Sequence, residues 1–581
     1  MANKLSTKRH SVAHLLATVI KKLYPNAKLG IGPAIKDGFY YDFYNLNIKE
    51  KDIPKIENEV KKLAKKEILF KKLEISKKEA KKIFKNEPFK LELINELKDE
   101  KISVYQSGDF VDLCKGPHIK STKELNPKGI KILELAGSYW KGKETNPMLL
   151  RIYGTYFDDE KKLKKYLENL EEIKKSNHKV IGEELNLFGI YPETIGSGLV
   201  LWHPNGAIVR KEIEDFWKEV HLENNYQLVY TPHIGRLELW KKSGHFQHYK
   251  EMMYVPIKME DESYLLKPMN CPFHVQIYSS RQRSYKDLPI RLAELGTVYR
   301  YEKKGVLLGL LRVRGFTQDD AHIFCSVDQL EEEIEKVYEL ALSMLKIFGF
   351  KKFEVELALR DSQNKKGYIG NSLAWKKAEE ALRKVLNKKK VKFKEGIGEA
   401  KFYGPSIDIK LLDNLERSWQ GPTIQVDFNF PEKFNLYFIN KEGKKERPVM
   451  IHRTVLGAIE RFVANLTEQY KGAFPVWLSP IQIAIIPVNE NFSNLALKIA
   501  EKLKEFRTKV MSSSETVSKR IMEGEKQKIP YIIVIGEKEK DVLSKNTPIP
   551  VRIRGKGVLK MGLKNFKEYV DKKINKKSVE P

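Results

Sequence analysis

Apolar residues recur at helical spacing in three parts of the chain, residues 10–23, 158–177 and 203–221. Apolar side chains three or four positions apart share one helix face, so each part is predicted to be an amphipathic helix. The second is densely charged between its apolar positions, which favours a linker helix between domains. A short strand, residues 226–230, follows the third helix and ends before Pro232. Because proline cannot extend a ladder, this strand is expected at a sheet edge, as part of a dimer contact.

A hairpin is predicted in the middle of the chain. An apolar run from Leu288 to Tyr299 is followed by a turn at Lys303–Gly305, and a second stretch with strand character continues to Phe324. Two such stretches joined by a Lys/Gly turn are typical of a hairpin. We expect the rest of the central domain to be arranged around it.

Charged residues flank the turn of this hairpin. Side chains alternate along a strand, so Arg300 and Glu302 are expected on one face of the first strand, and Arg312 and Arg314 on one face of the return strand. Fixed guanidinium groups suit a polyphosphate or the end of a nucleic acid. Solvated surface arginines are the alternative, but the amide, carboxylate and imidazole side chains that follow at residues 318–322 favour a site.

From about Leu478 the pattern changes to alternating strands and helices. The segments 481–488, 531–536 and 551–553 are rich in β-branched residues, and residues 493–506 have helical periodicity. This alternation predicts a small C-terminal α/β domain with a mixed sheet.

Composition narrows the class of protein. With 581 residues, 41% hydrophobic and 31% charged, the chain is long enough for three or four globular domains. It has no apolar run long enough to cross a bilayer and no signal peptide. Only three cysteines are present, which excludes a disulfide scaffold and fits a reducing cytoplasm. The net charge of +29 indicates a polyanionic partner, although solvated lysine-rich helices are an alternative explanation.

Two separated segments carry candidate metal ligands. His10 and His14 are four residues apart and share a helix face, and residues 109–118 bring Cys114 and His118 into one turn. The three histidines and the cysteine form a set of four soft ligands, so the residue types alone indicate a zinc-like cluster. A helix surface next to an unrelated loop is the weaker alternative.

The motifs of this chain resemble a known family. They are H-S-V-A-H at 10–14, D-L-C-K-G-P-H at 112–118, K-P-M-N-C-P at 267–272, L-R-V-R-G-F-T-Q-D-D-A-H-I-F-C at 311–325, F-Y-G-P at 402–405 and V-M-I-H-R at 449–453. Together they resemble the three motifs of class II aminoacyl-tRNA synthetases, and among these the threonyl-tRNA synthetase family, over nearly the whole chain.

The resemblance implies a multidomain architecture of α+β and α/β type. It implies an N-terminal editing domain at 1–157, a linker helix at 158–182, an antiparallel-sheet catalytic domain with zinc at 183–477, and an α/β anticodon-binding domain at 478–581. The small N-terminal domain that many members carry is expected to be absent. The implied activity is the ligation of L-threonine to tRNA(Thr) through an adenylate made from ATP, by a cytoplasmic homodimer with no membrane association.

The resemblance also implies one catalytic Zn²⁺, held by Cys271, His322 and His452, which binds the amine and β-hydroxyl of threonine. Valine lacks the hydroxyl and is rejected by ~10⁴-fold or more, whereas serine lacks only a methyl group, which contributes only ~1–3 kcal/mol. Serine is therefore expected to be activated, and this predicts an editing site for Ser-tRNA(Thr). The family places that site in the first domain, at His10, His14, Asp112, Cys114 and His118. There it needs no metal, so positioned water replaces the zinc interpretation.

For ATP, the resemblance implies that Arg300 holds the α-phosphate and Arg461 the γ-phosphate, with Mg²⁺ on the phosphates and Glu302 and Phe316 at the adenine. The positions at which the family contacts threonine or the adenylate, or acts in catalysis, are Arg312, Gln318, Asp320, Tyr403 and Gln420.

Some positions depart from the family pattern, namely Ser406 after Y-G-P, Gly421-Pro422 after Trp419-Gln420, and the segment 512–520 in the anticodon domain. Arg552, Arg554 and Lys556 remain as a basic edge for phosphates. A class II-like RNA-binding protein without turnover is the alternative, and a metallohydrolase built on the N-terminal cluster is a more distant one. The first needs neither the phosphate arginines nor the zinc ligands, and the second does not explain the arginine hairpin.

Overall fold

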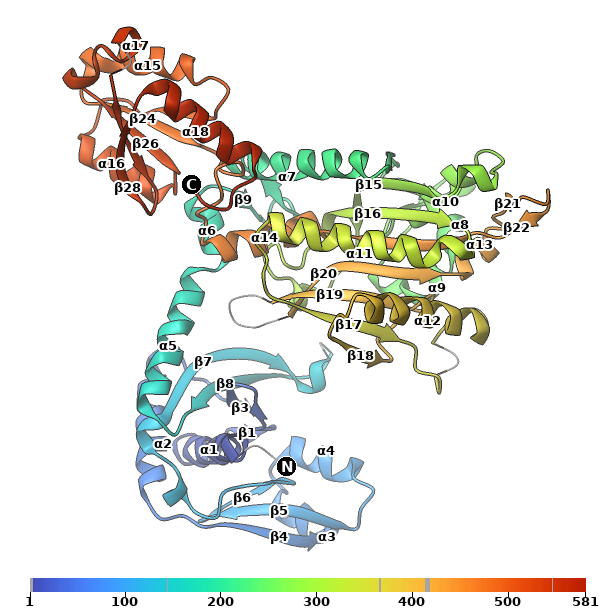
Figure 1. The fold of residues 1–581 in the computed structure, drawn as a ribbon. Helices are drawn as coiled ribbons and strands as arrows, with labels where there is room; N and C mark the ends of the chain where they lie inside the picture. The colour runs from blue at the N-terminus through green and yellow to red at the C-terminus, as the bar shows by residue number, and fades with distance from the viewer. Residues whose placement is uncertain (1–3, 144, 365–366, 413–417, 546) are drawn as a thin grey trace. The chain divides into compact units, whose positions relative to one another are not determined.

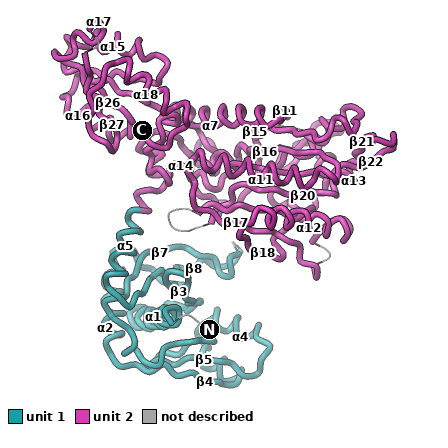
Figure 2. The backbone as a smooth tube through the Cα atoms, viewed as in Figure 1, with its two compact units in different colours: residues 1–172 teal, residues 173–581 magenta. Residues whose placement is uncertain are grey.

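The computed structural model describes residues 4–143, 145–364, 367–412, 418–545 and 547–581. The chain divides into two compact units, residues 1–172 and 173–581 (Figure 2). Within the described ranges, no helix has both the length and the apolar character needed to cross a membrane.

Unit 1 is built around helix α1 (Lys4–Leu23), which packs against strands β3 and β8 (Figure 1). Its antiparallel sheet has the order β1-β3-β8-β7, with β2 paired to β3, and a second sheet has the order β4-β5-β6. The strands are β1 (Lys28–Leu29), β2 (Ala34–Ile35), β3 (Gly38–Tyr44), β4 (Phe70–Ser76), β5 (Lys101–Ser107), β6 (Phe110–Leu113), β7 (Ile130–Tyr139) and β8 (Met148–Tyr156). The other helices are α2 (Ile53–Lys65), α3 (Lys77–Ile83) and α4 (Pro88–Glu96), and α5 (Glu160–Lys175) continues past the last residue of this unit.

The centre of unit 2 is a large sheet with the order β11-β15-β16-β23-β20-β19-β17-β18. Neighbouring strands are antiparallel except in the pairs β11–β15 and β17–β18. The strands are β11 (Gln227–Leu228), β15 (Ile290–Tyr299), β16 (Gly315–Cys325), β17 (Phe353–Leu359), β18 (Phe393–Ile397), β19 (Ser406–Leu412), β20 (Ser418–Asp427) and β23 (Val449–Thr454). The predicted strand at 226–230 is therefore β11, at the sheet edge as expected.

Long amphipathic helices pack against this sheet (Figure 1). They are α7 (Pro204–Glu223), α11 (Leu330–Ile347), α12 (Ser372–Lys388) and α14 (Ile459–Tyr470). Shorter elements are α6 (His178–Glu184), β9 (Phe188–Gly189), β10 (Leu201–Trp202), β12 (Ile234–Arg236), α8 (Leu237–Ser243), α9 (His245–His248), β13 (Ile257–Met259), β14 (Glu262–Leu266), α10 (Cys271–Ser279), α13 (Asn429–Lys433), β21 (Phe438–Ile439) and β22 (Lys445–Glu446). The three helices predicted from apolar spacing are confirmed as α1, α5 and α7.

The predicted hairpin is present as β15 and β16, but the expectation that its charged residues lie on the strands is wrong. Strand β15 ends at Tyr299 and β16 begins at Gly315, so Arg300, Glu302, Arg312 and Arg314 all lie in the connecting loop. The backbone N–H of Arg314 donates to the carbonyl of Gly198 at 2.7 Å, so the chain there also pairs with a segment from outside the hairpin. Period-two alternation therefore does not determine where these side chains point.

The C-terminal part of unit 2 is an α/β fold with the sheet order β25-β24-β26-β27-β28. Strand β24 is parallel to β25 and β26, whereas β26–β27 and β27–β28 are antiparallel, which confirms the predicted mixed sheet. The elements are β24 (Ile483–Pro487), α15 (Ser493–Lys502), β25 (Thr508–Val510), α16 (Val517–Lys526), β26 (Tyr531–Ile535), α17 (Val542–Lys545), β27 (Ile549–Ile553), β28 (Gly557–Met561) and α18 (Leu563–Asn575). The prediction missed β25 and β28, which are short and largely exposed.

Candidate functional site

A buried group of soft ligands lies on the large sheet of unit 2. Cys271 begins helix α10, and strands β16 and β23 carry His322 and His452, which are directly opposite each other in the antiparallel register. Their ligand atoms all lie within 4.8 Å of one another, and all three side chains are buried. Three protein ligands of this type fit a zinc ion that keeps a position open for a substrate.

Burial controls the protonation of this group. It raises the pKa of the Cys271 thiol well above its usual value and lowers the pKa of His322 well below its usual value. The imidazole is therefore neutral, as a metal ligand must be. The thiol needs a nearby cation to lose its proton, and a bound divalent metal supplies one. This donor set fits zinc.

Polar side chains orient the two histidines from behind. The carboxylate of Asp427 lies 3.0 Å from His452 Nε2, which leaves Nδ1 for a metal. His322 Nδ1 lies 2.8 Å from His274 Nδ1, and His274 Nε2 lies 3.2 Å from the carboxylate of Glu294. Such partners hold the tautomer and the ring orientation of metal-binding histidines.

Of the residues predicted to contact threonine, two lie close to the His322 and His452 imidazoles and a third has a buried polar atom without a hydrogen-bond partner among the described residues. Asp320 is 3.7 Å from His322 Nε2, and burial raises its pKa. The ring of Tyr403 is centred 5.0 Å from that of His452. Gln318 Oε1 is buried and has no hydrogen-bond partner in the described part of the chain. The amide of Gln420, in contrast, donates to Asp408 and Thr423.

Arginines gather at the loop between β15 and β16. The guanidinium of Arg300 lies 5.1 Å from the ring centre of Phe316, and Arg312 forms an ion pair with Glu302 at 3.0 Å. Arg461, from α14, donates from Nε to the carbonyl of Leu311 at 3.0 Å. Burial lowers the pKa of Arg461, and the positive charges of Arg300 and Arg312 lower it further. Three guanidinium groups held this close together favour an anionic ligand such as a polyphosphate.

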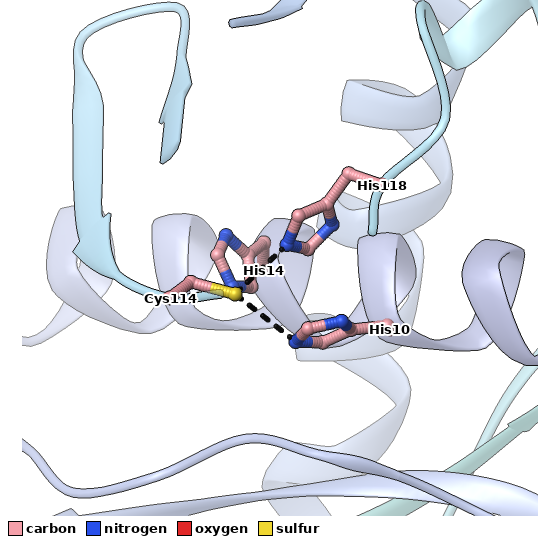
Figure 3. A group of neighbouring side chains, drawn as sticks. All are labelled: His10, His14, Cys114 and His118. Atoms are coloured by element: carbon pink, nitrogen blue, oxygen red, sulfur yellow. Dashed lines mark hydrogen bonds between the residues drawn. The ribbon is translucent and has the colours of Figure 1, made fainter. Parts of the chain in front are cut away.

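The second ligand group lies in unit 1, and its members point toward one another (Figure 3). His10 and His14 come from α1, and Cys114 follows β6; Cys114 Sγ lies 3.5 Å from His10 Nε2 and 3.3 Å from His118 Nε2. Burial raises the pKa of Cys114 to about 11 and lowers the pKa values of all three histidines. Neutral imidazoles and a protonated thiol can hydrogen-bond a water molecule and a polar substrate.

A buried ion pair, which sequence reasoning missed in part, supports this group. Lys90 Nζ lies 2.5 Å from Asp112 Oδ1, and both side chains are almost fully buried. Tyr41 donates its hydroxyl to Asp112 Oδ2 at 2.6 Å, and His14 Nε2 lies 3.7 Å from the same oxygen. Asp112 was predicted. Lys90 was not, because it lies in no segment with a recognisable pattern. Tyr41 lies in the stretch G-F-Y-Y-D at 38–42, whose turn-and-strand pattern indicates a pocket wall but no specific role for this side chain.

Comparison with known proteins shows to which family of class II synthetases the chain is similar. The model of the tRNA synthetase class II core domain (G, H, P, S and T) matches residues 254–470. The threonyl and alanyl tRNA synthetase second additional domain matches residues 102–153, and the anticodon binding domain matches residues 482–573. The chain is 49% identical to the threonine–tRNA ligase of Dehalococcoides mccartyi strain CBDB1, over 99% of this chain and 98% of that protein. The chain belongs to the threonyl-tRNA synthetase family.

Other relatives agree with this assignment. The threonine–tRNA ligase of Borreliella burgdorferi strain ZS7 is 48% identical over 92% of each chain. The solved RNA binding domain of threonyl-tRNA synthetase from Cryptosporidium parvum Iowa II is 35% identical and has a TM-score of 0.64, covering 68% of this chain and 98% of that one. These findings confirm the resemblance, the fold class and the enzyme class predicted from the motifs.

For a member of the threonyl-tRNA synthetase family, the structure brings together the three predicted zinc ligands, the predicted phosphate arginines and the predicted editing residues. It also adds His245, which sequence reasoning missed. This imidazole is buried, and its Nε2 lies 3.8 Å from Cys271 Sγ while Nδ1 lies 2.8 Å from Ser243 Oγ. Burial, together with the nearby His452, lowers its pKa to about 3, so it is a neutral base beside the predicted zinc ligands. Its only signal in the sequence is S-G-H, which has no periodic context.

Arg554 was expected to belong to a basic edge that binds phosphates, but its side chain is engaged within the fold. Its guanidinium donates to the backbone carbonyls of Ala473 and Phe474, and burial lowers its pKa to about 10. It therefore connects the C-terminal fold to the segment before it. Arg552 keeps a partly exposed side chain, paired with Glu525 at 3.4 Å.

Proposed function

We propose that this chain ligates L-threonine to tRNA(Thr) through a threonyl-adenylate formed from ATP, and hydrolyses mischarged Ser-tRNA(Thr) in its N-terminal domain. The observation that carries the proposal is the buried group of Cys271, His322 and His452 on the sheet whose neighbouring loop gathers three arginines. An RNA-binding protein without turnover would need neither group.

Zinc held by these three residues would supply a Lewis acid for the amine and β-hydroxyl of threonine. The protein side chains then define the rest of the amino acid pocket. Asp320 and Gln318 offer polar atoms on β16, and Tyr403 closes one side of the zinc ligands. A serine side chain satisfies the same polar contacts and loses only a methyl contact, so this pocket rejects valine far better than serine.

The arginines are proposed to bind ATP. Arg300 would hold the α-phosphate and Arg461 the γ-phosphate, with Mg²⁺ bound to the triphosphate, and Glu302 and Phe316 would contact the adenine. The side chains are fixed before ATP arrives, because Arg300 donates to Pro268 O and Arg461 to Leu311 O. Fixed cations around the phosphates stabilise the charge that develops when the threonine carboxylate attacks the α-phosphorus in line.

The unit 1 group is proposed to hold water against the ester of Ser-tRNA(Thr). Burial keeps His10, His14, Cys114 and His118 uncharged at neutral pH, and the carboxylate of Asp112 lies beside them.

The domain limits 1–157, 158–182, 183–477 and 478–581 remain predictions.

The proposed assembly is a cytoplasmic homodimer. Its support is the exposure of large apolar side chains near β11 to β14: Tyr230 is 84% exposed, Val255 86% and Met259 59%. Large apolar side chains this exposed are often found where another protein binds. Sedimentation equilibrium at micromolar concentration is expected to give twice the chain mass, and Tyr230→Lys is expected to shift the protein toward the monomer.

Amino-acid-dependent ATP–pyrophosphate exchange tests the function, paired with charging of tRNA(Thr). We expect exchange with threonine, weaker exchange with serine without stable Ser-tRNA, and none with valine. Cys271→Ala should abolish exchange, whereas Cys325→Ala, which removes an equally buried thiol outside the group, should keep it. No exchange with any of the three amino acids, on zinc-replete protein, would leave only the RNA-binding alternative.

A further inference from the structure

A buried histidine outside the three class II motifs contacts the ATP-binding loop. His178 is the first residue of α6, which follows the linker helix α5 in the chain, and its side chain is fully buried. Its Nδ1 lies 2.7 Å from Oε1 of Glu468, and its Nε2 accepts the backbone N–H of Leu310 at 3.1 Å. Because Nε2 accepts from an N–H, the proton of this neutral imidazole is on Nδ1, where it is donated to Glu468.

Glu468 holds both the imidazole and the backbone of His178 by hydrogen bonds. The same carboxylate oxygen also accepts the backbone N–H of His178 at 3.2 Å, in the first turn of α6. Glu468 lies seven residues after Arg461 on α14, so the two side chains share a face of that helix. One helix face therefore holds backbone groups of two adjacent loop residues, Leu311 C=O directly through Arg461 and Leu310 N–H through His178.

The loop is tightly confined at this point. Gly309 has φ of +49°, and a Cβ there would lie 2.2 Å from His178 Nε2. The next residue past Leu311 is Arg312, whose guanidinium forms the ion pair with Glu302. A shift of the peptide at Leu310 would therefore move an arginine of the proposed ATP site.

We propose that His178 is a positioning residue for ATP binding. It fixes the return arm of the loop, residues 308–314, so that Arg312 and Arg461 face the phosphates together. Without the bond at Leu310 N–H, ATP must order the arm on binding, and its affinity falls. The proposal rests on the proposed ATP-binding role of this loop.

Two substitutions separate the two hydrogen bonds of the imidazole. The amide oxygen of Gln extends about as far as Nε2 and can still accept from Leu310, whereas Asn extends only about as far as Nδ1 and can keep only the bond to Glu468. We expect His178→Asn to raise KM for ATP about tenfold in pyrophosphate exchange, equal to ~1.4 kcal/mol, with KM for threonine within about twofold. His178→Gln should recover most of the ATP affinity.

Hydrogen exchange provides a readout independent of activity. The Leu310 amide should lose protection in His178→Asn and keep it in His178→Gln. His221→Gln is the matched control. His221 is equally buried, but among the described residues its ring nitrogens bond only the carbonyl of Trp217, so both readouts should stay unchanged. Equal KM for ATP in the Asn and Gln variants, or a parallel rise in KM for threonine, would overturn the proposal. Inactive wild-type protein would instead refute the proposed function.

Discussion

Asp319 connects the elements that build the catalytic sheet, and replacing it tests whether that connection stabilises unit 2. The carboxylate is fully buried on β16. Oδ1 accepts Nε1–H of Trp217 at 2.7 Å and Nη1–H of Arg453 at 3.0 Å. Oδ2 accepts the backbone N–H groups of Val455, at 2.6 Å, and Leu456. One anion thus joins α7, β16 and the end of β23.

The substitution Asp319→Asn preserves shape and removes the charge. Whichever way the amide is oriented, its NH₂ group faces two donors that had shared one carboxylate oxygen. Each buried donor left without an acceptor costs ~1–3 kcal/mol. The buried Arg453 also loses its counter-charge, and breaking a buried ion pair typically costs ~3–5 kcal/mol. We expect unit 2 to lose ~3–5 kcal/mol of stability.

Native-state hydrogen exchange in peptides from β16 and β23 is the suitable assay, because a chain of several domains does not unfold in a single two-state step. The expected loss corresponds to roughly 10²-fold to 4 × 10³-fold faster exchange in these strands. Asp328→Asn, at an exposed position three residues after β16, should change it by less than ~0.5 kcal/mol. A change below ~1 kcal/mol for Asp319→Asn would show that the network contributes little and refute the reasoning.

Two further predictions concern charge in buried places. Burial raises the pKa of Glu460 to about 7 from a usual 4.5, despite nearby Arg210. A raised carboxyl pKa means that the stability this group contributes is complete below pH 4.5 and is lost as pH rises through 7. Glu460→Gln should therefore gain ~3 kcal/mol of stability relative to the wild type between pH 4.5 and 7. A stability difference from native-state hydrogen exchange that does not vary with pH would contradict this. Lys90→Met leaves Asp112 buried without its cation, and it should let Ser-tRNA(Thr) accumulate while threonine exchange stays unchanged. Undiminished deacylation by this variant would show that Lys90 has no part in editing.

The spacing of apolar residues and the chemistry of short motifs were enough to predict many of the helices and strands and the kinds of side chain available to bind a metal or a phosphate. Apolar spacing predicted α1, α5 and α7, and β-branched runs predicted β24, β26 and β27 of the C-terminal sheet. Motifs picked out the residues proposed as zinc ligands and as the editing site, because those side chains lie in short segments with recognisable chemistry. The arginines beside the hairpin were recognised for the same reason, but their place in a loop was not, since strand ends depend on pairing with Gly198, over a hundred residues away.

The amino-acid sequence by itself determined which donors this protein has: a thiol and imidazoles of the kind that bind a metal, guanidinium groups of the kind that bind phosphates, and a His/Cys set at the proposed editing site. Only the tertiary structure decided which of them meet. Antiparallel register sets His322 opposite His452, and packing brings Lys90 to Asp112 and His178 to Leu310 across long stretches of chain. Burial then determines their charge, because the cost of removing an ionised group from water depends on the surroundings that the fold creates.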